Sequence, residues 1–275
     1  MSEARVPVVL TIAGSDSGGG AGIEADLKAF AAAGVHGTCA ITALTAQNTV
    51  AVEAICAVSP AMIVAQARAV VDDIGVDAVK VGMLGTRETI AAVGEALDLV
   101  GGVPVVVDPV MVSESGSELL QADAAEALIG TILPRADVLT PNLPEAQRLA
   151  GAEESATPAE LARAIRRLGP AAVVVTGGHA DGADVLDDGA GEPLRIPGEI
   201  HADGAAHGSG CTHSSTLAAM LALGHPLRDA AIEARRVAGE AIANGLRGIG
   251  SGPGPVDVLG IAGRSQGGRP ATPLA

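Results

Sequence analysis

Aromatic residues are almost missing from this sequence of 275 residues, because Phe30 is the only one and there is no Trp or Tyr. Hydrophobic residues still make up 48% of the chain, so a sizeable core can form. That core must be packed with Ala, Val, Leu and Ile. Small side chains of this kind favour a close approach of helices to a sheet.

Cysteine and long apolar runs are scarce as well. Cys39, Cys56 and Cys211 are the only three cysteines, and their odd number and wide spacing indicate neither a disulfide framework nor a Cys-x-x-Cys metal site. Such usage fits a reducing cytoplasm. The sequence shows no signal-peptide pattern and no apolar run long enough to cross a bilayer. We therefore expect a cytoplasmic protein with no membrane partner.

Positive charge is the third deficit. Seventeen Lys and Arg face 32 Asp and Glu, which gives a net charge of −15, and Lys28 and Lys80 are the only lysines. An acidic, lysine-poor chain suits high salt, and a GC-rich genome also exchanges Lys for Arg. A charge of this sign repels duplex nucleic acid, so no nucleic-acid partner is expected. A nucleotide can still bind through backbone N–H groups and a bound cation.

Short apolar runs alternate with helical patterns along the chain. The predicted strands are 6–13, 37–43, 51–58, 78–81, 103–107, 136–140 and 171–175, with a short hairpin at 184–186 and 194–196. The predicted helices are 22–33, 60–73, 86–100, 122–132, 145–150, 158–168, 210–223 and 227–246. This alternation indicates an α/β protein whose mostly parallel sheet has helices on both faces. We expect one domain, 1–260, and a disordered tail, 261–275.

In an open parallel sheet, ligands bind beyond the carboxyl ends of the strands. The residues that follow the predicted strands should therefore meet at one edge. They are Gly14-Ser15-Asp16, Gln47-Asn48, Gly82-Met83, Asp108-Pro109, Asn142 and Thr176-Gly177-Gly178. Their convergence predicts a single ligand site.

Two glycine-rich segments belong to this predicted site. Residues 16–22 follow the first strand and can wrap backbone around a ligand. A flexible loop is the alternative interpretation of the same glycine-rich pattern. Residues 208–212 precede a helix, whose N-terminal N–H groups favour anionic oxygens such as those of a phosphoryl group in transfer. A glycine-capped helix start is the alternative for that segment. No Lys precedes its Ser or Thr, so it is not a Walker A loop.

Asp108 and Glu145 are candidate Mg²⁺ carboxylates, acting directly or through water, because magnesium prefers oxygen ligands and keeps several waters. Asn142 and Glu145 also fit a helix capping box, and both interpretations can hold together. His207 and His213 flank the second glycine-rich segment, and a structural role is expected for His213. No Ser-His-Asp order supports a hydrolase.

Taken together, these segments are similar to those of a known enzyme family. The matching pieces are residues 11–28, 46–49, 80–84, 107–111, 139–146, 177–179 and 207–212, in the right order. By these motifs the chain resembles the hydroxymethylpyrimidine/phosphomethylpyrimidine kinases of thiamine biosynthesis, in the ribokinase superfamily. The resemblance implies a ribokinase-like three-layer αβα sandwich with a central, mostly parallel sheet.

The resemblance also implies an activity. ATP, with Mg²⁺, would phosphorylate the hydroxymethyl group of 4-amino-5-hydroxymethyl-2-methylpyrimidine and then the resulting monophosphate. Members of the family commonly form homodimers. Two alternatives stay open: a pyridoxal (vitamin B6) kinase on the same scaffold, and a non-catalytic sensor of a nucleotide or a thiamine precursor.

Residue roles follow from the same resemblance. The implied substrate contacts are Gln47, which would hydrogen-bond the aminopyrimidine, Gly14, Met83 and Val110 around the ring, and Asp26 near the hydroxyl. The implied anion hole consists of Gly208, Ser209, Gly210 and Cys211. The implied ATP contacts are Asp108, Asn142, Thr176, Gly178 and Thr212, with Asp108 and Glu145 at the metal.

Two positions depart from the superfamily pattern. Most members place an Asp, the catalytic base, where this chain has Cys211. A thiol at a helix N-terminus is expected to have a lowered pKa, so a thiolate base is one interpretation; a backbone N–H and the right shape are the other. Many members carry a Lys where this chain has Thr176. Without that charge, Mg²⁺ and the helix N-terminus should carry more of the stabilisation.

Overall fold

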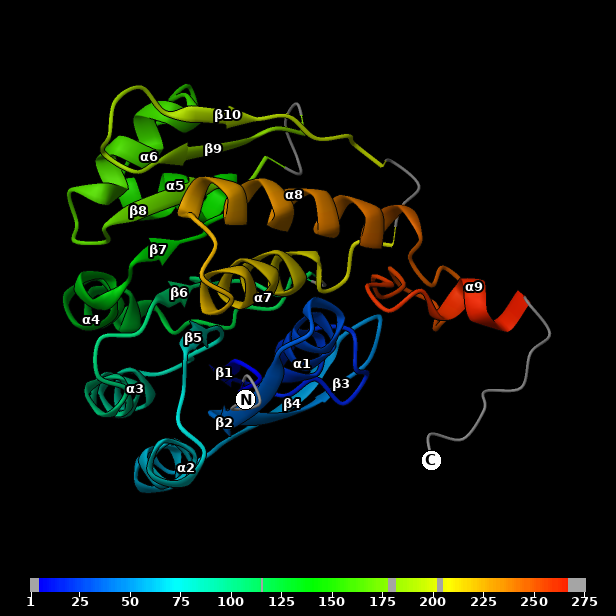
Figure 1. Ribbon diagram of the computed structural model, residues 1–275, viewed down its shortest axis with the longest axis horizontal. Coiled ribbons are helices and arrows are strands. Elements are labelled where there is room, and N and C mark those ends of the chain that lie inside the picture. Colours follow the sequence, from blue (N-terminus) through cyan, green and yellow to red (C-terminus); the bar gives the residue numbers. More distant parts are fainter. Residues whose placement is uncertain (1–4, 115, 178–181, 202–204, 267–275) are drawn as a thin grey trace.

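The computed structural model describes residues 5–114, 116–177, 182–201 and 205–266. Within these ranges the strands of the main sheet lie in the order β10-β9-β8-β7-β6-β5-β1-β2 (Figure 1). Strands β2, β1, β5, β6, β7 and β8 pair in parallel, and β9 and β10 extend the sheet in antiparallel pairs. The predicted three-layer, mostly parallel α/β fold is confirmed.

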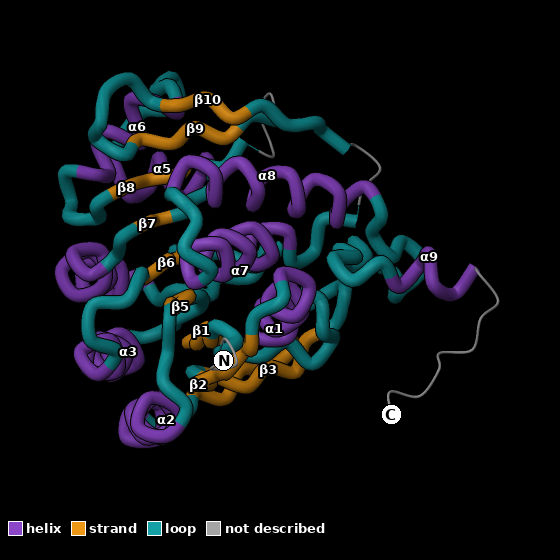
Figure 2. Tube along the Cα trace, in the orientation of Figure 1, coloured by secondary structure: helices purple, strands orange, loops and turns teal. Residues whose placement is uncertain are grey.

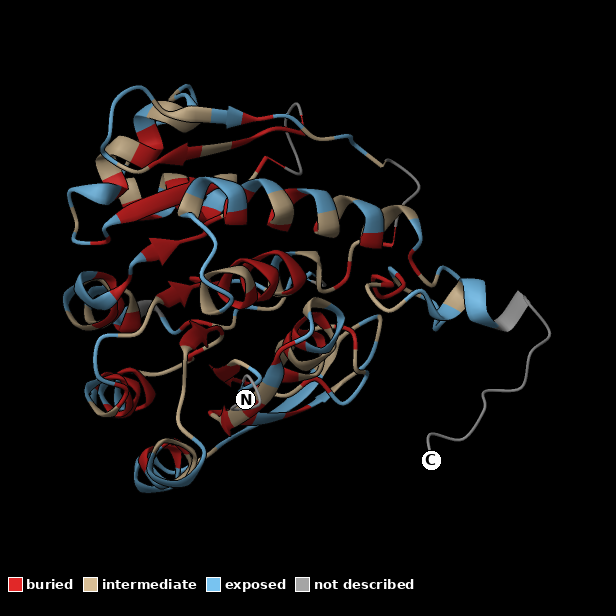
Figure 3. Cartoon of the chain, in the orientation of Figure 1, coloured by how far each residue is buried: buried red, intermediate tan, exposed pale blue. Residues whose placement is uncertain are grey.

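The bounds of the strands follow the apolar runs of the sequence. They are β1 Val8–Ala13, β2 His36–Ile41, β3 Ala43–Gln47, β4 Val52–Ala57, β5 Ala78–Val81, β6 Val105–Val107, β7 Val138–Leu139, β8 Ala172–Val175, β9 Asp184–Asp187 and β10 Leu194–Ile196. The central strands are buried on both faces (Figure 3), as parallel strands between two helix layers require.

Helices cover both faces of the sheet, as the tube view shows (Figure 2). Helices α1 (Gly22–Ala33), α7 (Ser209–Ala222) and α8 (Leu227–Ala243) lie on one face. The other face carries α2 Pro60–Asp73, α3 Arg87–Leu99, α4 Ala125–Ala127, α5 Leu143–Ala150 and α6 Pro158–Arg166. Phe30 packs in the first layer among alanines and valines. The short side chains of α7 and α8 allow these helices to approach the sheet closely.

The predicted strand 37–43 is wrong in one respect, because it divides at Thr42. Residues before Thr42 belong to β2, and those after it begin β3, which pairs with β4 in a separate two-stranded sheet. The Thr42 hydroxyl donates to the carbonyl of Met83 at 2.9 Å. This bond fixes the chain where it leaves the main sheet and turns towards the ligand edge.

Two further segments differ from the predicted elements. Residues 122–132 form a 3-10 turn, the short α4 and a π-helix instead of one α-helix. Pro134 follows in another 3-10 turn, and because it lacks an N–H it cannot continue a regular helix. At the start of the tail 261–275, residues Ile261–Gln266 form helix α9. The division into one domain, 1–260, and a disordered tail stays a prediction.

No helix within the described ranges combines the length and the apolar character that a membrane crossing needs.

Candidate active site

One pocket opens at the carboxyl edge of the parallel strands, where the sequence predicts a ligand site. Twelve of the residues predicted to act in the site line this pocket: Gly14, Gln47, Met83, Asp108, Val110, Asn142, Glu145, Thr176, Gly208, Ser209, Gly210 and Cys211. They come from the ends of β1, β3, β5, β6, β7 and β8 and from the start of α7. The fold therefore brings together residues that are distant in sequence. Gly178 lies outside the described residues.

Asp16 organises the first glycine-rich loop. Its Oδ1 accepts the N–H of Gly18 at 2.8 Å, and its Oδ2 accepts the N–H groups of Gly20 and Ala21 at 2.9 and 2.8 Å. The Nε2 of His207 lies 2.9 Å from the same Oδ2. Burial alone would raise the pKa of Asp16, but these hydrogen bonds together lower it. Residues 16–22 therefore form a hydrogen-bonded loop around an ionised carboxylate.

The two glycine-rich segments interlock, and glycine is required where they touch. Gly208 has φ +85°, and a Cβ at this position would lie 1.8 Å from the carbonyl oxygen of Gly20. A Cβ on Gly20 would lie 2.1 Å from the ring of His207. Only backbones without side chains can approach so closely. The wall of the pocket is thus one unit built from both ends of the chain.

The second glycine-rich segment places the N-terminus of α7 in the pocket wall. Gly208 is the N-cap, and the first helical residue is Ser209. The backbone N–H groups of Gly210 and Cys211 have no acceptor among the described residues. Two free N–H groups at the positive end of a helix are what an anionic oxygen needs. We name residues 208–211 the anion loop.

Cys211 differs from the expectation. Burial raises the pKa of its thiol to about 12, and the nearby carboxylates of Asp26 and Asp108 add to this rise. Lys80 and the N–H of Gly22 act in the opposite direction without overcoming the burial. The expected lowering of the Cys211 pKa is therefore wrong. The geometry favours the interpretation in which Cys211 contributes its backbone N–H and its shape.

Asp108 and Glu145 form a buried carboxylate pair opposite the anion loop. Burial and then the charge of Asp108 raise the pKa of Glu145 to about 8. Burial also raises the pKa of Asp108, against the charge of Lys80. Two buried carboxylates that repel each other are a site where a divalent cation is stabilised.

The oxygens of Glu145 are already engaged by the backbone. Glu145 Oε1 accepts the N–H of Met111 at 3.2 Å, and Oε2 accepts the N–H of Asn142 at 3.0 Å. Asn142 Oδ1 accepts the N–H of Glu145 in return, so the predicted capping box is confirmed. In the described part of the chain no group of three or more His, Cys, Asp and Glu side chains could hold a metal. The two carboxylates fit a magnesium ion that keeps most of its waters.

Two predicted contacts are buried behind the pocket wall. Asp26 has no exposed surface and does not line the pocket; it forms an ion pair with Lys80 at 2.8 Å. Thr212 also has no exposed surface, because the second residue after Gly210 turns inward on α7. Neither side chain lies where it could touch a ligand directly in this arrangement.

Several residues that line the pocket were not predicted from the sequence as site residues, and two of them, Lys80 and Arg235, are basic. Lys80 stands in the middle of the otherwise apolar strand β5, and a lysine in such a strand is the signal that could have revealed it. Arg235 on α8 lines the pocket and donates to the carbonyls of Gly182 and Glu199. No sequence signal separates Arg235 from the other arginines of that helix.

His213 has the structural role that the sequence predicts. Its Nε2 lies 2.9 Å from Asp184 Oδ2, and Asp184 Oδ1 accepts the N–H of Gly177. His213 is buried in α7 and does not line the pocket. The pair therefore ties α7 to the backbone that follows β8.

An anion loop that faces buried carboxylates at the carboxyl edge of a parallel sheet defines a small-molecule kinase. Comparison with known proteins makes this class specific. The family model for phosphomethylpyrimidine kinase matches residues 16–257, so the chain belongs to that family of phosphotransferases.

Individual relatives agree with this assignment. The hydroxymethylpyrimidine/phosphomethylpyrimidine kinase of Rhizobium meliloti is 48% identical over 256 residues, which cover 90% of this chain and 96% of the relative. The phosphomethylpyrimidine kinase structure from Clostridium difficile is 38% identical, with a TM-score of 0.75, and the match covers 86% of this chain and all of that one. The Staphylococcus aureus pyridoxal kinase in complex with AMP-PCP and pyridoxal is 33% identical, with a TM-score of 0.82 and coverage of 93% and 94%.

Proposed function

We propose that this protein transfers the γ-phosphoryl group of ATP to 4-amino-5-hydroxymethyl-2-methylpyrimidine and then to the monophosphate product. The observation that carries the proposal is that one pocket is lined by both the anion loop and the amide of Gln47. The relatives are named for these two kinase activities. The chain would therefore supply the diphosphate used in thiamine biosynthesis.

The substrate half of the pocket fits an aminopyrimidine. Gln47 is half-buried, and Ser17 orients it, because the Ser17 hydroxyl accepts the backbone N–H of Gln47 at 2.8 Å and donates to its backbone carbonyl at 2.7 Å. The side-chain amide of Gln47 offers both a donor and an acceptor to the edge of the ring. Gly14 lies against Met83, since a Cβ on Gly14 would be 3.2 Å from the Met83 methyl group. Together with Val110 these residues form an apolar slot for a flat ring.

The nucleotide half of the pocket fits a triphosphate. Thr176 and Asn142 lie side by side through a parallel β-bridge, and both line the pocket next to Glu145. The free N–H groups of Gly210 and Cys211 would bind oxygens of the transferred phosphoryl group, whose negative charge rises during the transfer. When bound, Mg²⁺ would neutralise phosphate oxygens near Asp108 and Glu145.

A substrate panel tests this proposal. The pyrimidine, its monophosphate and pyridoxal are each incubated with ATP and Mg²⁺, and the mono- and diphosphate products are resolved by anion-exchange chromatography. We expect turnover of both pyrimidine substrates. Pyridoxal is included as the alternative substrate, because the S. aureus relative binds it. Turnover of pyridoxal with none of the pyrimidine would overturn the assignment.

A second experiment separates a kinase from a ligand sensor. In the variant Asp108→Asn we expect the pyrimidine to bind as before, measured by calorimetry, while turnover falls by about 100-fold. If the protein were a sensor, the natural protein too would bind the pyrimidine without phosphorylating it. A homodimer in the cytoplasm is proposed from the family, and the molar mass in solution by light scattering checks the dimer.

A further inference from the structure

A cluster of four polar side chains lies directly beneath the pocket floor. It consists of Thr11 on β1, Asp26 on α1, Lys80 on β5 and Ser215 on α7, and none of them has exposed surface. Thr11 and Lys80 are register partners in the paired strands β1 and β5. Both side chains therefore point towards the same layer of helices, where Asp26 and Ser215 meet them.

The carboxylate of this cluster is fully committed inside the protein. Asp26 Oδ2 accepts the hydroxyl of Thr11 at 2.6 Å, and Oδ1 accepts the hydroxyl of Ser215 at 2.7 Å and Lys80 Nζ at 2.8 Å. Three donors, one of them cationic, stabilise the buried negative charge. Asp26 thus holds Lys80 in one position, and its own buried carboxylate is not available to a ligand.

Lys80, by contrast, has N–H groups that have no acceptor among the described residues. An ammonium group carries three N–H bonds, and Lys80 donates to a single acceptor, Asp26, among the described residues. Lys80 has no exposed surface, but unlike Thr11, Asp26 and Ser215 it borders the pocket, so it is the member of the cluster that a tightly bound group can reach. Gly82 leaves room for the ammonium, since a Cβ there would lie 2.9 Å from Nζ. Buried N–H groups without acceptors are unfavourable, so a group that enters the pocket is expected to complete them.

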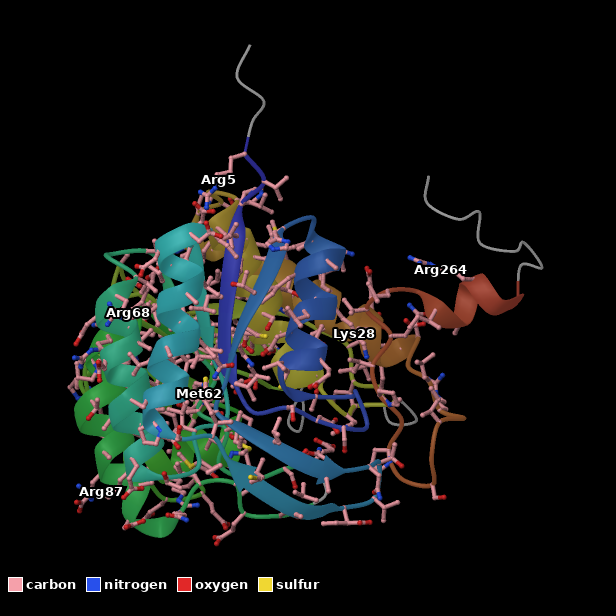
Figure 4. All side chains as sticks on the ribbon, turned by 90° about the horizontal axis from the view of Figure 1, so that it is seen from below. Arg5, Lys28, Met62, Arg68, Arg87 and Arg264 are labelled. Atoms are coloured by element: carbon pink, nitrogen blue, oxygen red, sulfur yellow. The ribbon has the colours of Figure 1, made fainter. Side chains whose placement is uncertain are left out.

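The chemistry around Lys80 indicates an anionic group. Burial alone would lower the pKa of Lys80, but Asp26, Cys211 and Asp108 raise it, so the ammonium stays charged. Thr176 brings no positive charge to the pocket. Arg235, the other Lys or Arg in the lining, already donates to two backbone carbonyls. Arg68 and Arg87 are exposed on the outside of the molecule (Figure 4) and do not line the pocket.

We propose that Lys80 is a catalytic residue for phosphoryl transfer, whose free N–H groups donate to oxygens of the transferred group, and that Asp26 is its positioning residue. In this step the bond from the γ-phosphorus to the leaving oxygen of ADP breaks, and a bond to the acceptor oxygen forms. The acceptor proton passes to water, and Lys80 keeps all of its protons. The inference rests on the proposed kinase function but not on which acceptor is used.

Mutagenesis separates this role from a structural one. Lys80→Met leaves Asp26 buried without its cation, so we expect a lower melting temperature and a loss of kcat of at least about 100-fold. The double variant Lys80→Met/Asp26→Asn removes both charges. We expect it to regain stability while kcat stays at least about 100-fold down and the KM for the acceptor changes by less than about 3-fold.

The control is another ion pair with a buried carboxylate. Arg166 lies 3.0 Å from Asp187, which is buried, and neither residue lines the pocket. Arg166→Met should lower the melting temperature and leave kcat unchanged. A folded double variant at Lys80 and Asp26 with kcat close to that of the natural protein would overturn the proposal.

A spectroscopic measurement leaves Lys80 and Asp26 unchanged. Because the chain has only two lysines, labelling with ¹³C-lysine gives two Cε signals, which Lys28→Arg assigns. AMP-PCP with the pyrimidine should shift the Lys80 signal, and the pyrimidine alone should shift it much less. An unchanged Lys80 signal with bound AMP-PCP would refute the contact. If the natural protein does not phosphorylate the pyrimidine, the proposed function fails, and Lys80 is then tested with the acceptor that the panel identifies.

Discussion

The contact between the two glycine-rich loops makes a sharp prediction for Gly208→Ala. A Cβ at Gly208 would lie 1.8 Å from the carbonyl oxygen of Gly20, whereas real Cβ contacts are essentially never under 3.0 Å. The loops must therefore separate by more than an ångström. The backbone oxygen of Gly20 cannot rotate away as a side chain would. The separation moves the anion loop relative to the substrate half of the pocket.

A matched control is present at the other end of the same helix. Gly224 has φ +84°, almost equal to that of Gly208, but a Cβ there meets nothing within 4 Å. Both alanine variants share the strain of a left-handed residue, about 1–2 kcal/mol. Only Gly208→Ala adds the collision with Gly20. Any difference between the two variants therefore reports the contact between the loops.

The assay compares kcat/KM and thermal stability for both variants. We expect Gly224→Ala to lose about 1–2 kcal/mol of stability and to keep its activity. Gly208→Ala should lose at least about 100-fold in kcat/KM, because a displacement of one ångström in a reacting geometry costs that much. Equal activities of the two variants would refute the argument that the interlocked loops position the anion loop.

Three further predictions concern titratable groups of the pocket. Because desolvation raises the pKa of the half-buried Cys211 to about 12, iodoacetamide at pH 8 should label Cys211 at least about 100-fold more slowly than the exposed Cys56, as peptide mass spectrometry measures; equal labelling would contradict the raised pKa. The pKa of Glu145 is raised from 4.5 to about 8, so its contribution to stability is complete below pH 4.5 and is lost as the pH rises through 8. Without metal, Glu145→Gln should remove up to about 5 kcal/mol of that decline in denaturant titrations, and an unchanged pH profile would count against it. Burial also raises the pKa of Asp108, so Asp108→Asn should stay within about 1 kcal/mol of the natural stability while activity falls, and a variant that unfolds would contradict this.

The order of the elements could be predicted from the sequence, for local reasons. Short runs such as 78–81, which is apolar apart from Lys80, and 171–175 are bounded by glycine, proline or charge, and they form strands β5 and β8. The capping box of Asn142 and Glu145 involves residues three apart, so its pattern is complete in the sequence. The position of the pocket followed from the general rule for parallel sheets.

The remaining features depend on contacts between distant residues. The break at Thr42 rests on a hydrogen bond to Met83, and the ion pair of Asp26 and Lys80 joins residues 54 positions apart. The raised pKa of Cys211 depends on how deeply α7 is buried and on which carboxylates lie near it. A helix N-terminus can be recognised in a sequence, but the desolvation that outweighs it cannot.

The central place of α7 also bears on how the protein is made. Helix α7 packs on β1, β5 and β6, yet it follows every strand of the main sheet in the sequence. While the ribosome is still adding residues before 209, the face of the sheet that includes Val9 and Val106 is covered only in part, by α1. Such a face is prone to aggregation and is a target for chaperones. The anion loop is made together with this cover, so a partly synthesised chain lacks a complete pocket and gains one when its core closes.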